Sequence, residues 1–165
     1  MVFSELVLLS SLLFLLLVAN GAPVIARKML PNVAANPIDC GKVFIDRQPL
    51  LGHSKTIRGV FASLICTTCT AILLDMNIVV GVLIAVGAML GDLFASFVKR
   101  RLHIQPSGQA LLLDQVPETL LPLLLVADRF GLLIADIILL VVAFIALELV
   151  LSRILFKLKI RRRPY

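Results

Sequence analysis

The sequence has little charge and little cysteine. Charged residues make up 16% of its 165 residues and apolar residues 60%, whereas soluble globular domains are typically about 25% charged and about 45–50% apolar. So few water-facing residues exclude an ordinary soluble domain and a disordered chain. Three cysteines also exclude a secreted fold held together by several disulfides. The composition therefore predicts an integral membrane protein.

Lysine and arginine are missing from four long stretches, which set the expected membrane spans. These stretches cover 2–26, 59–98, 102–128 and 130–152. The second is about twice as long as one span needs, and Asp75-Met-Asn77 divides it. We predict an all-α integral membrane protein with a single domain over 1–165. About five spans are expected, at 4–25, 59–74, 78–98, 116–127 and 131–156, of which the fourth is short.

The distribution of positive charge predicts the orientation. All but Arg129 of the 16 Lys and Arg lie in segment 26–58, in segment 98–115 or in the tail after 152. With five spans, these three segments share one side of the membrane, and the positive-inside rule places that side in the cytoplasm. We therefore expect the N-terminus outside, the C-terminus in the cytoplasm, and cytoplasmic loops at about 26–58 and 98–115. The expected location is the plasma membrane, which the chain crosses several times.

The cytoplasmic end of the first span carries Asn20-Gly-Ala-Pro23. This segment is expected to break the helix, because Pro23 removes a backbone hydrogen bond. Such a break either lines a cavity or simply ends the span, and the sequence leaves both open. We expect the run to be retained rather than cleaved as a signal peptide, since its start carries Glu5 and no positive charge.

The candidate chemistry lies at two acidic helix ends. At the cytoplasmic end of the third span, Asp92, Ser96, Lys99 and Arg100 have the spacing of one helix face. Asp114 follows at the start of the fourth span, also on the cytoplasmic side. A carboxylate this close to the membrane is costly unless it is paired or bound to a metal. A pair between Asp92 and Lys99 or Arg100 that merely closes the helix end is the structural alternative.

Oxygen ligands without a thiolate or imidazole set suit Mg²⁺, which usually takes one or two carboxylates plus substrate phosphates. We predict that Asp92 and Asp114 bind Mg²⁺, with Glu118 as a further candidate, and that Lys99 is catalytic beside them. Positive-inside bias and anionic lipid also explain many of the basic residues, and no nucleic-acid partner is expected. The candidate phosphate-binding residues are Asn20, Lys42, Lys55, Thr56, Arg58, Ser96 and Arg100.

Five short motifs, in this order along almost the whole chain, resemble those of the CDP-archaeol synthase family, which is related to the phosphatidate cytidylyltransferases. After Asp-Gln the family pattern usually has a further acid, Asp-Gln-x-Asp, whereas this chain has Pro117 followed by Glu118. Glu118 can replace the absent acid one residue later. The motifs are Ala19-Asn20…Pro23, Asn36-Pro-Ile-Asp39-x-Gly41-Lys, Leu51-Gly-x-x-Lys55-Thr-x-Arg58-Gly, Gly91-Asp…Ser96-Phe-x-Lys-Arg-Arg101 and Leu113-Asp-Gln115.

The resemblance implies a five-helix membrane enzyme that uses Mg²⁺ and CTP. The expected reaction transfers CMP from CTP to a lipid phosphomonoester, giving a CDP-lipid and pyrophosphate, with the bilayer and the lipid phosphate as the other partners. The residues leave two alternatives open. One is a small transporter or channel with a pathway lined by Asp136, Glu148 and the helix of Asp92, and the other is a membrane scaffold without catalysis.

Overall fold

The computed structural model describes residues 2–105, 108, 110 and 112–159, and within these ranges all regular structure is helical. Each predicted span overlaps one helix, so the predicted all-α fold with five helices is confirmed. The helices are α1 (Val2–Met29), α2 (Ile57–Leu73), α3 (Ile78–Arg101), α4 (Gln115–Phe130) and α5 (Ile134–Lys157).

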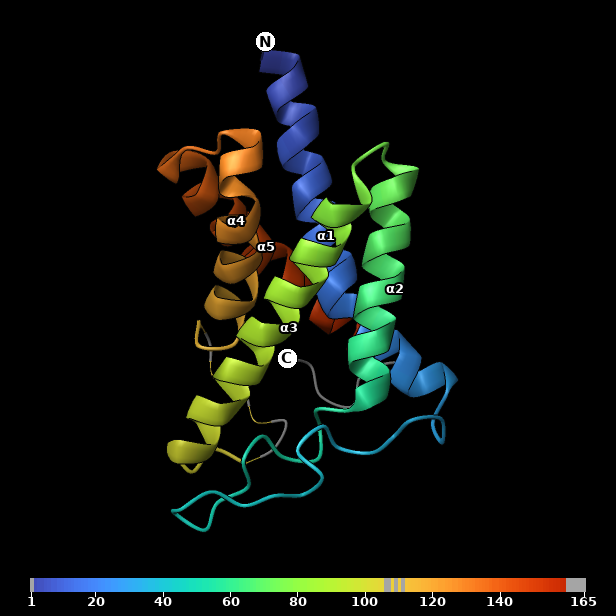
Figure 1. The fold of residues 1–165 in the computed structure, drawn as a ribbon, viewed down its shortest axis with the longest axis vertical. Helices are drawn as coiled ribbons and strands as arrows, with labels where there is room; N and C mark the ends of the chain where they lie inside the picture. Colours follow the sequence, from blue (N-terminus) through green and yellow to red (C-terminus); the bar gives the residue numbers. More distant parts are fainter. Residues whose placement is uncertain (1, 106–107, 109, 111, 160–165) are drawn as a thin grey trace.

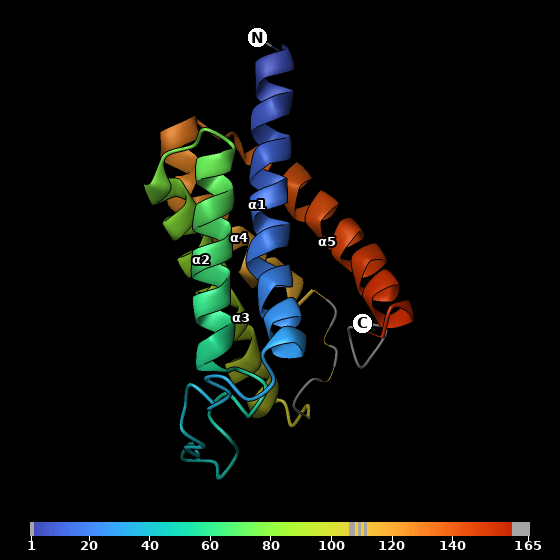
Figure 2. The ribbon, with the colours of Figure 1, turned by 90° about the vertical axis from the view of Figure 1, so that its right-hand side faces the viewer.

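The helices form a bundle around the middle part of α1, and its N-terminal turns project above the other helices (Figures 1 and 2). α2 and α3 form a hairpin beside α1, and α4 packs along α3. The core contains fully buried side chains from several helices, among them Leu15 of α1, Ile84 of α3 and Leu123 of α4. α5 leans away from the other helices (Figure 2) and buries only Leu140, Phe144 and Ser152.

The helices differ in their ability to cross a bilayer. Judged by length and composition, α1, α3 and α5 are long and apolar enough to span a membrane. α2 has 17 residues and α4 has 16, near or below the lower limit of about 17 residues for a spanning helix. The short α4 agrees with the prediction that the fourth span is short.

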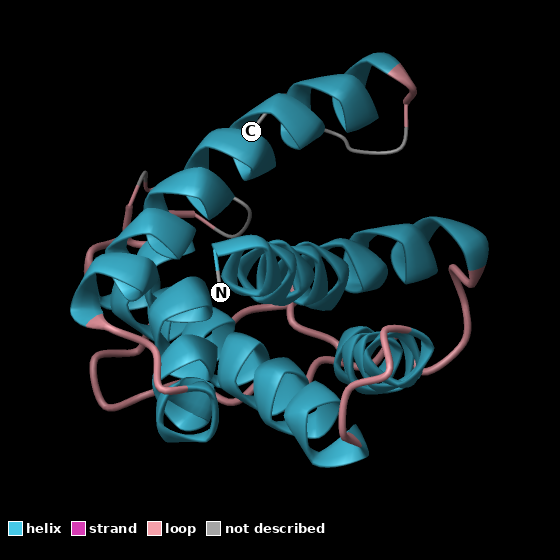
Figure 3. Ribbon diagram, turned by 90° about the horizontal axis from the view of Figure 1, so that it is seen from above, coloured by secondary structure: helices cyan, strands magenta, loops and turns pink. Residues whose placement is uncertain are grey.

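Pro23 does not end α1, contrary to the expected break at 20–23. The helix continues through Pro23 to Met29, and seen from above it bends, so that its last part runs sideways (Figure 3). A proline inside a helix removes one backbone hydrogen bond and commonly bends the helix without terminating it. The Asn20 side chain bonds within the same helix, donating from Nδ2 to the Leu16 carbonyl at 3.0 Å.

The two long connections lie at one end of the bundle. Segment 30–56 and the described part of segment 102–114 are at the lower end in Figure 1, whereas the short turns 74–77 and 131–133 are at the upper end. α5 also ends on the lower side (Figure 2). The described parts of the two basic connections and the end of α5, which carries Arg153 and Lys157, therefore lie toward one end of the molecule. Arg161, Arg162 and Arg163 of the predicted basic tail lie outside the described residues. That this end faces the cytoplasm stays a prediction.

Candidate active site at the basic end of the bundle

A close approach of two backbones sets the position of the site. A Cβ atom added to Gly91 of α3 would lie 2.2 Å from the carbonyl oxygen of Pro117 and 2.6 Å from the Cα of Glu118, both in α4. Only a residue without a side chain permits this contact. Asp92 follows Gly91 directly, so the crossing brings Asp92 to the first turn of α4.

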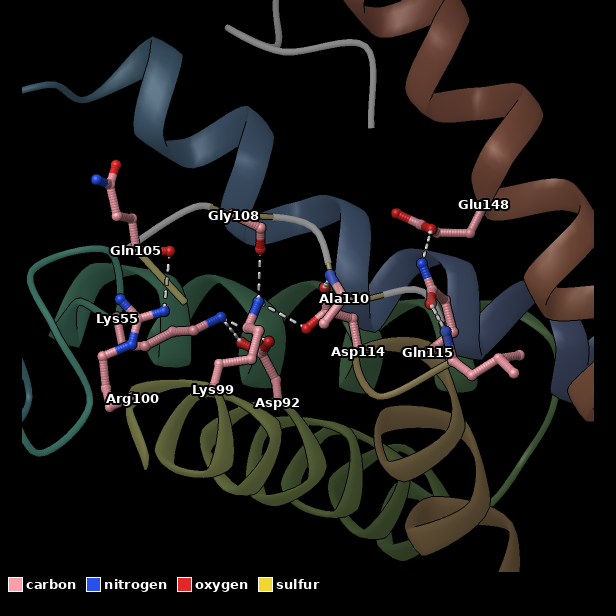
Figure 4. Close-up of polar contacts among 11 residues, drawn as sticks. Lys55, Asp92, Lys99, Arg100, Gln105, Gly108, Ala110, Asp114, Gln115 and Glu148 are labelled. Carbon is pink, nitrogen blue, oxygen red and sulfur yellow. Dashed lines mark hydrogen bonds and ion pairs between the residues drawn. The ribbon is translucent and has the colours of Figure 1, made fainter. Parts of the chain in front are cut away.

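Asp92 pairs with a lysine from the 30–56 segment. Lys55 Nζ lies 2.5 Å from Asp92 Oδ1 and 2.6 Å from Oδ2, so the ammonium contacts both carboxylate oxygens (Figure 4). Both side chains are partly buried, with 20% and 25% exposure. The structural alternative in which Asp92 pairs with Lys99 or Arg100 of its own helix is therefore wrong. The 30–56 segment folds back over the end of α3 and supplies the cation instead.

Lys99 pairs with the second predicted carboxylate. Its Nζ lies 2.6 Å from Asp114 Oδ1 and donates to the carbonyl of Gly108 at 3.1 Å. The other oxygen of Asp114 accepts the backbone N–H of Ala110 at 3.1 Å. Figure 4 shows Asp92, Lys99 and Asp114 side by side, with Lys55 approaching Asp92 from the opposite side. The two ion pairs thus form one cluster that joins α3, the start of α4 and the 30–56 segment.

Arg100 is almost completely buried beside this cluster, with 3% exposure. Its Nη2 donates to the Gln105 carbonyl at 3.0 Å, but Nε and Nη1 have no hydrogen-bond partner within the described part of the chain. Buried guanidinium nitrogens without partners are costly. The unused donors suit an anion, because guanidinium nitrogens bind phosphate oxygens in pairs.

Glu118 is buried one turn into α4, with 8% exposure. Its carboxyl interacts electrostatically with Asp92, Asp114 and Glu148, and with Lys55 as the opposing cation. It therefore belongs to the same charge cluster, although the sequence predicted it only as a further candidate.

Sequence reasoning missed the contribution of α5. The side chain of Gln115 is buried and donates from Nε2 to Glu148 Oε2 at 3.0 Å, while its Oε1 accepts the N–H of Leu112 at 3.0 Å (Figure 4). Gln115 stands in a quoted motif, but no local pattern marks Glu148. Asp136, the other residue of the transporter alternative, accepts the N–H of Leu133 at the start of α5. These contacts give the two α5 acids structural partners.

Two predicted phosphate-binding residues shape helix ends. Thr56 begins α2, and its Oγ1 accepts the N–H of Gly59 at 3.3 Å. Arg58 is buried at the start of α2, and its Nη1 donates to the carbonyls that follow α1. These carbonyls belong to Leu30, Pro31 and Val33. Both residues thus connect α2 to the segment that carries Lys55.

The remaining predicted site residues are spread more widely. Ser96 is buried on α3 between Asp92 and Arg100 in the sequence. Lys42 is exposed in the 30–56 segment, and Asn20 bonds within α1. The structure thus brings Lys55, Asp92, Lys99, Arg100, Asp114 and Glu118 into one cluster, with Ser96 on the same helix.

The donor chemistry of the cluster fits Mg²⁺. The described residues contain no ready-made group of three or more acid, histidine or cysteine ligands. Asp92 and Asp114 instead each hold an ammonium in the position that a cation would take. Two carboxylates with the remaining ligands supplied by phosphates and water are the usual magnesium arrangement.

The fold and the site together define an all-helical intramembrane protein with an ion-paired polar cluster at its basic end. A family model described as CarS-like CDP-archaeol synthase matches residues 4–165. The chain therefore belongs to the CDP-archaeol synthase family.

Individual relatives agree with this assignment. A CDP-archaeol synthase of Sulfolobus acidocaldarius is 31% identical over 156 residues, covering 90% of this chain and 91% of that protein. One of Thermofilum pendens is 42% identical over 104 residues, which is 60% of this chain and only 51% of that protein. A solved structure of an intramembrane enzyme for archaeal membrane lipids biosynthesis is 31% identical, with a TM-score of 0.74 over 86% of this chain and 90% of that one.

Proposed function

We propose that this protein is a CTP:lipid-phosphate cytidylyltransferase of phospholipid biosynthesis. It transfers CMP from CTP to a lipid phosphomonoester and releases pyrophosphate. The acceptor is a 2,3-bis-O-geranylgeranyl-glycerol 1-phosphate-like or phosphatidate-like lipid, and the reaction depends on Mg²⁺. The site opens toward the cytoplasm, from which CTP arrives.

The observation that carries the proposal is the juxtaposition of Asp92 and Asp114 with three cations. Lys55 and Lys99 contact the two carboxylates. Arg100 is buried beside them, and two of its donors have no partner among the described residues. Acids and bases alternate in a partly buried cluster, which suits a metal-associated polyphosphate. Neither a scaffold nor a transport pathway requires this arrangement.

In the proposed reaction an oxygen of the lipid phosphate attacks the α-phosphorus of CTP. The new bond is P–O, the bond to the β-phosphate breaks, and pyrophosphate leaves. A phosphomonoester is already ionised near neutral pH, so no general base is required. The protein contributes chiefly by positioning and by neutralising charge.

Each residue of the cluster has a role in this scheme. Asp92 and Asp114, with Glu118 as a further candidate, would hold Mg²⁺, which when bound neutralises phosphate charge. Lys55, Lys99 and Arg100 donate to phosphate oxygens, and the charge on these side chains strengthens such bonds. Lys99 is the proposed catalytic cation, because its pair with Asp114 places its ammonium beside one of the two proposed metal ligands.

An apolar groove supports an acceptor with hydrocarbon chains. It has a volume of about 140 Å³ and lies between α2 and α3. Its α3 side ends at Leu93, the neighbour of Asp92 in the sequence. A hydrocarbon chain in this groove would keep its apolar surface out of water. The lining residues are Val60, Leu64, Val86, Met89, Leu90 and Leu93.

The test is incubation of the purified full chain with labelled CTP, Mg²⁺ and a panel of lipid phosphates. Matched acceptors with ether-linked isoprenoid chains and with ester-linked fatty chains identify the preferred lipid. We expect labelled CDP-lipid and an equal amount of pyrophosphate. A protein that inserts into the membrane and binds CTP but never converts it would contradict the proposal and favour a scaffold.

A further inference from the structure

Arg101, the last residue of α3, directly follows Arg100 of the charge cluster and holds the 30–56 segment. Its Nε lies 2.8 Å from Asp46 Oδ2, close enough for an ion pair although not aligned for a hydrogen bond. Its Nη2 donates to the carbonyl of Pro49 at 2.8 Å. One side chain thus contacts two points on the turn 46–49.

Two aromatic rings lie against the same guanidinium. The Arg101 Cζ atom lies 4.7 Å from the centre of the Phe44 ring and 4.8 Å from that of Phe97. The two rings meet edge to face, with their centres 5.4 Å apart. Cation–π contacts at these distances are attractive, and Phe97 belongs to α3 whereas Phe44 belongs to the segment. The rings and the ion pair together fix the segment to the end of α3.

Hydrogen bonds connect this attachment to Lys55. Two backbone hydrogen bonds hold segment 42–50 in a compact turn. The Phe44 N–H donates to the Gln48 carbonyl and the Leu50 N–H donates to the Lys42 carbonyl, each at 2.9 Å. The next two N–H groups, of Leu51 and Gly52, donate to Asp39 Oδ2 at 2.9 and 3.0 Å.

The connection ends at Lys55 itself. Ile38, the neighbour of Asp39, donates its N–H to the Lys55 carbonyl at 2.9 Å. The segment is therefore attached to α3 at two points. One is Arg101, and the other is the Lys55–Asp92 pair, about 14 Å earlier on the helix at 1.5 Å per residue.

We propose that Arg101 is a positioning residue that keeps Lys55 beside Asp92, and that it acts on the reaction through Lys55 rather than by touching phosphate. This inference rests on the proposed function. If Lys55 turns from Asp92 to a phosphate during the reaction, two attachments still hold its backbone close to the site. One is the start of α2, two residues later in the chain, and the other is the Arg101 contact with the turn 46–49. Loss of that attachment lowers the fraction of molecules with Lys55 in place.

The test is a double-mutant cycle on kcat/KM for CTP with Arg101→Met, Lys55→Met and the double variant. We expect each single change to lower kcat/KM about 10-fold to 100-fold, as for one lost charge-assisted contact. The double variant should be no worse than Lys55→Met alone, because Arg101 has nothing left to position. Losses that multiply in the double variant, or an unchanged kcat/KM in Arg101→Met, would overturn the proposal.

Arg101→Lys is the conservative variant. It replaces Arg101→Met in the double-mutant cycle if Arg101→Met does not fold. A lysine keeps the ion pair with Asp46 but lacks the planar group that lies against both rings and donates to Pro49. We expect an intermediate loss in the wild-type background and none beyond Lys55→Met in the Lys55→Met background. The matched control is Arg129→Met, an exposed arginine at the opposite end of α4, which should leave kcat/KM unchanged.

Hydrogen exchange separates failure of this inference from failure of the proposed function. Arg101→Met should raise exchange throughout 44–56, and Arg129→Met should not. If the wild type makes no CDP-lipid, the proposed function fails. A rise in hydrogen exchange that reaches residues 51–56 in Arg101→Met would still support the positioning of Lys55. A rise confined to 44–50 would show that the attachment does not extend to Lys55, and would overturn the inference.

Discussion

The Lys99 ammonium of α3 lies 2.6 Å from the Asp114 carboxylate, which directly precedes α4. This contact closes the polar cluster on the side opposite Lys55. It also ties the connection between α3 and α4 back to α3, because Lys99 binds the Gly108 carbonyl as well. The ion pair is thus both a fold contact and a part of the proposed site.

Asp92→Asn and Asp114→Asn should each abolish CDP-lipid formation. The amide keeps the size of the side chain but removes the charge that attracts Mg²⁺. We expect a loss of roughly 100-fold or more, above the 10–100-fold typical of residues that only support a metal ligand. The double variant should lose little more than the worse single one, since residues that act as a unit are not additive. Asp136→Asn is the control, and robust turnover by the double variant would contradict the site.

Lys55→Met and Lys99→Met should each weaken turnover by about 10-fold or more, because each removes a charge-assisted phosphate contact worth roughly 1.5–3 kcal/mol. Arg153→Met, an exposed arginine of α5, should change turnover little. The measurement is the initial rate at saturating and at low CTP. Equal losses in all three variants would mean that the overall positive charge, and not a shaped site, explains the effect.

Gly91→Ala should separate α3 from α4. The added Cβ has no room, since it would meet the Pro117 carbonyl oxygen at 2.2 Å. Overpacking of this kind costs about 1–3 kcal/mol and should also displace Asp92 from Asp114. Thermal unfolding in detergent and the CDP-lipid assay measure the two effects. Gly21→Ala in α1 is the matched control, because its Cβ meets nothing within 4 Å; equal behaviour of the two variants would refute this explanation.

Order in the 30–56 segment should depend on pH through Asp39. Burial acts to raise the pKa of Asp39, but the N–H groups of Leu51, Gly41 and Gly52 donate to its carboxylate and hold the pKa below its ordinary value of 3.8. The stabilisation is therefore present above pH 3.8 and is lost as the pH falls through the lowered pKa of the folded state.

Limited proteolysis across this pH range measures the effect. Wild-type protein should keep the segment protected down to about pH 3.8 and lose protection below it. Asp39→Asn should be less protected at neutral pH and should show no such transition. A variant with the wild-type pH profile would exclude Asp39 as the cause.

The orientation is tested by cysteine labelling in a variant without the three natural cysteines. A cysteine at Asp128, exposed near the end of α4, should react with a membrane-impermeant thiol reagent added outside intact cells. A cysteine at Ile45, which is 91% exposed in the 30–56 segment, should react only after the membrane is opened. The opposite result would place the polar cluster away from cytoplasmic CTP.

The sequence by itself determined the number and type of the helices and the segments that carry the positive charge. Apolar runs and the gaps in lysine and arginine are local features, and a helix satisfies its own backbone hydrogen bonds, so its position can be read from one stretch of chain. The motifs around Asp92 and Asp114 lie near two helix ends that the fold brings together. Local reading was wrong at Pro23, where a proline bent α1 without ending it.

The tertiary structure decided which charges meet. Asp92 has candidate partners on its own helix, yet it pairs with Lys55, and Glu148 of α5 bonds to Gln115. These pairings depend on how closely helices approach, which Gly91 sets at its contact with Pro117. They also depend on the path of the 30–56 segment, which Arg101 attaches to α3. Charge pairing acts over a few ångströms in space, whereas the residues concerned lie far apart in the sequence, so only the packed helices bring them together.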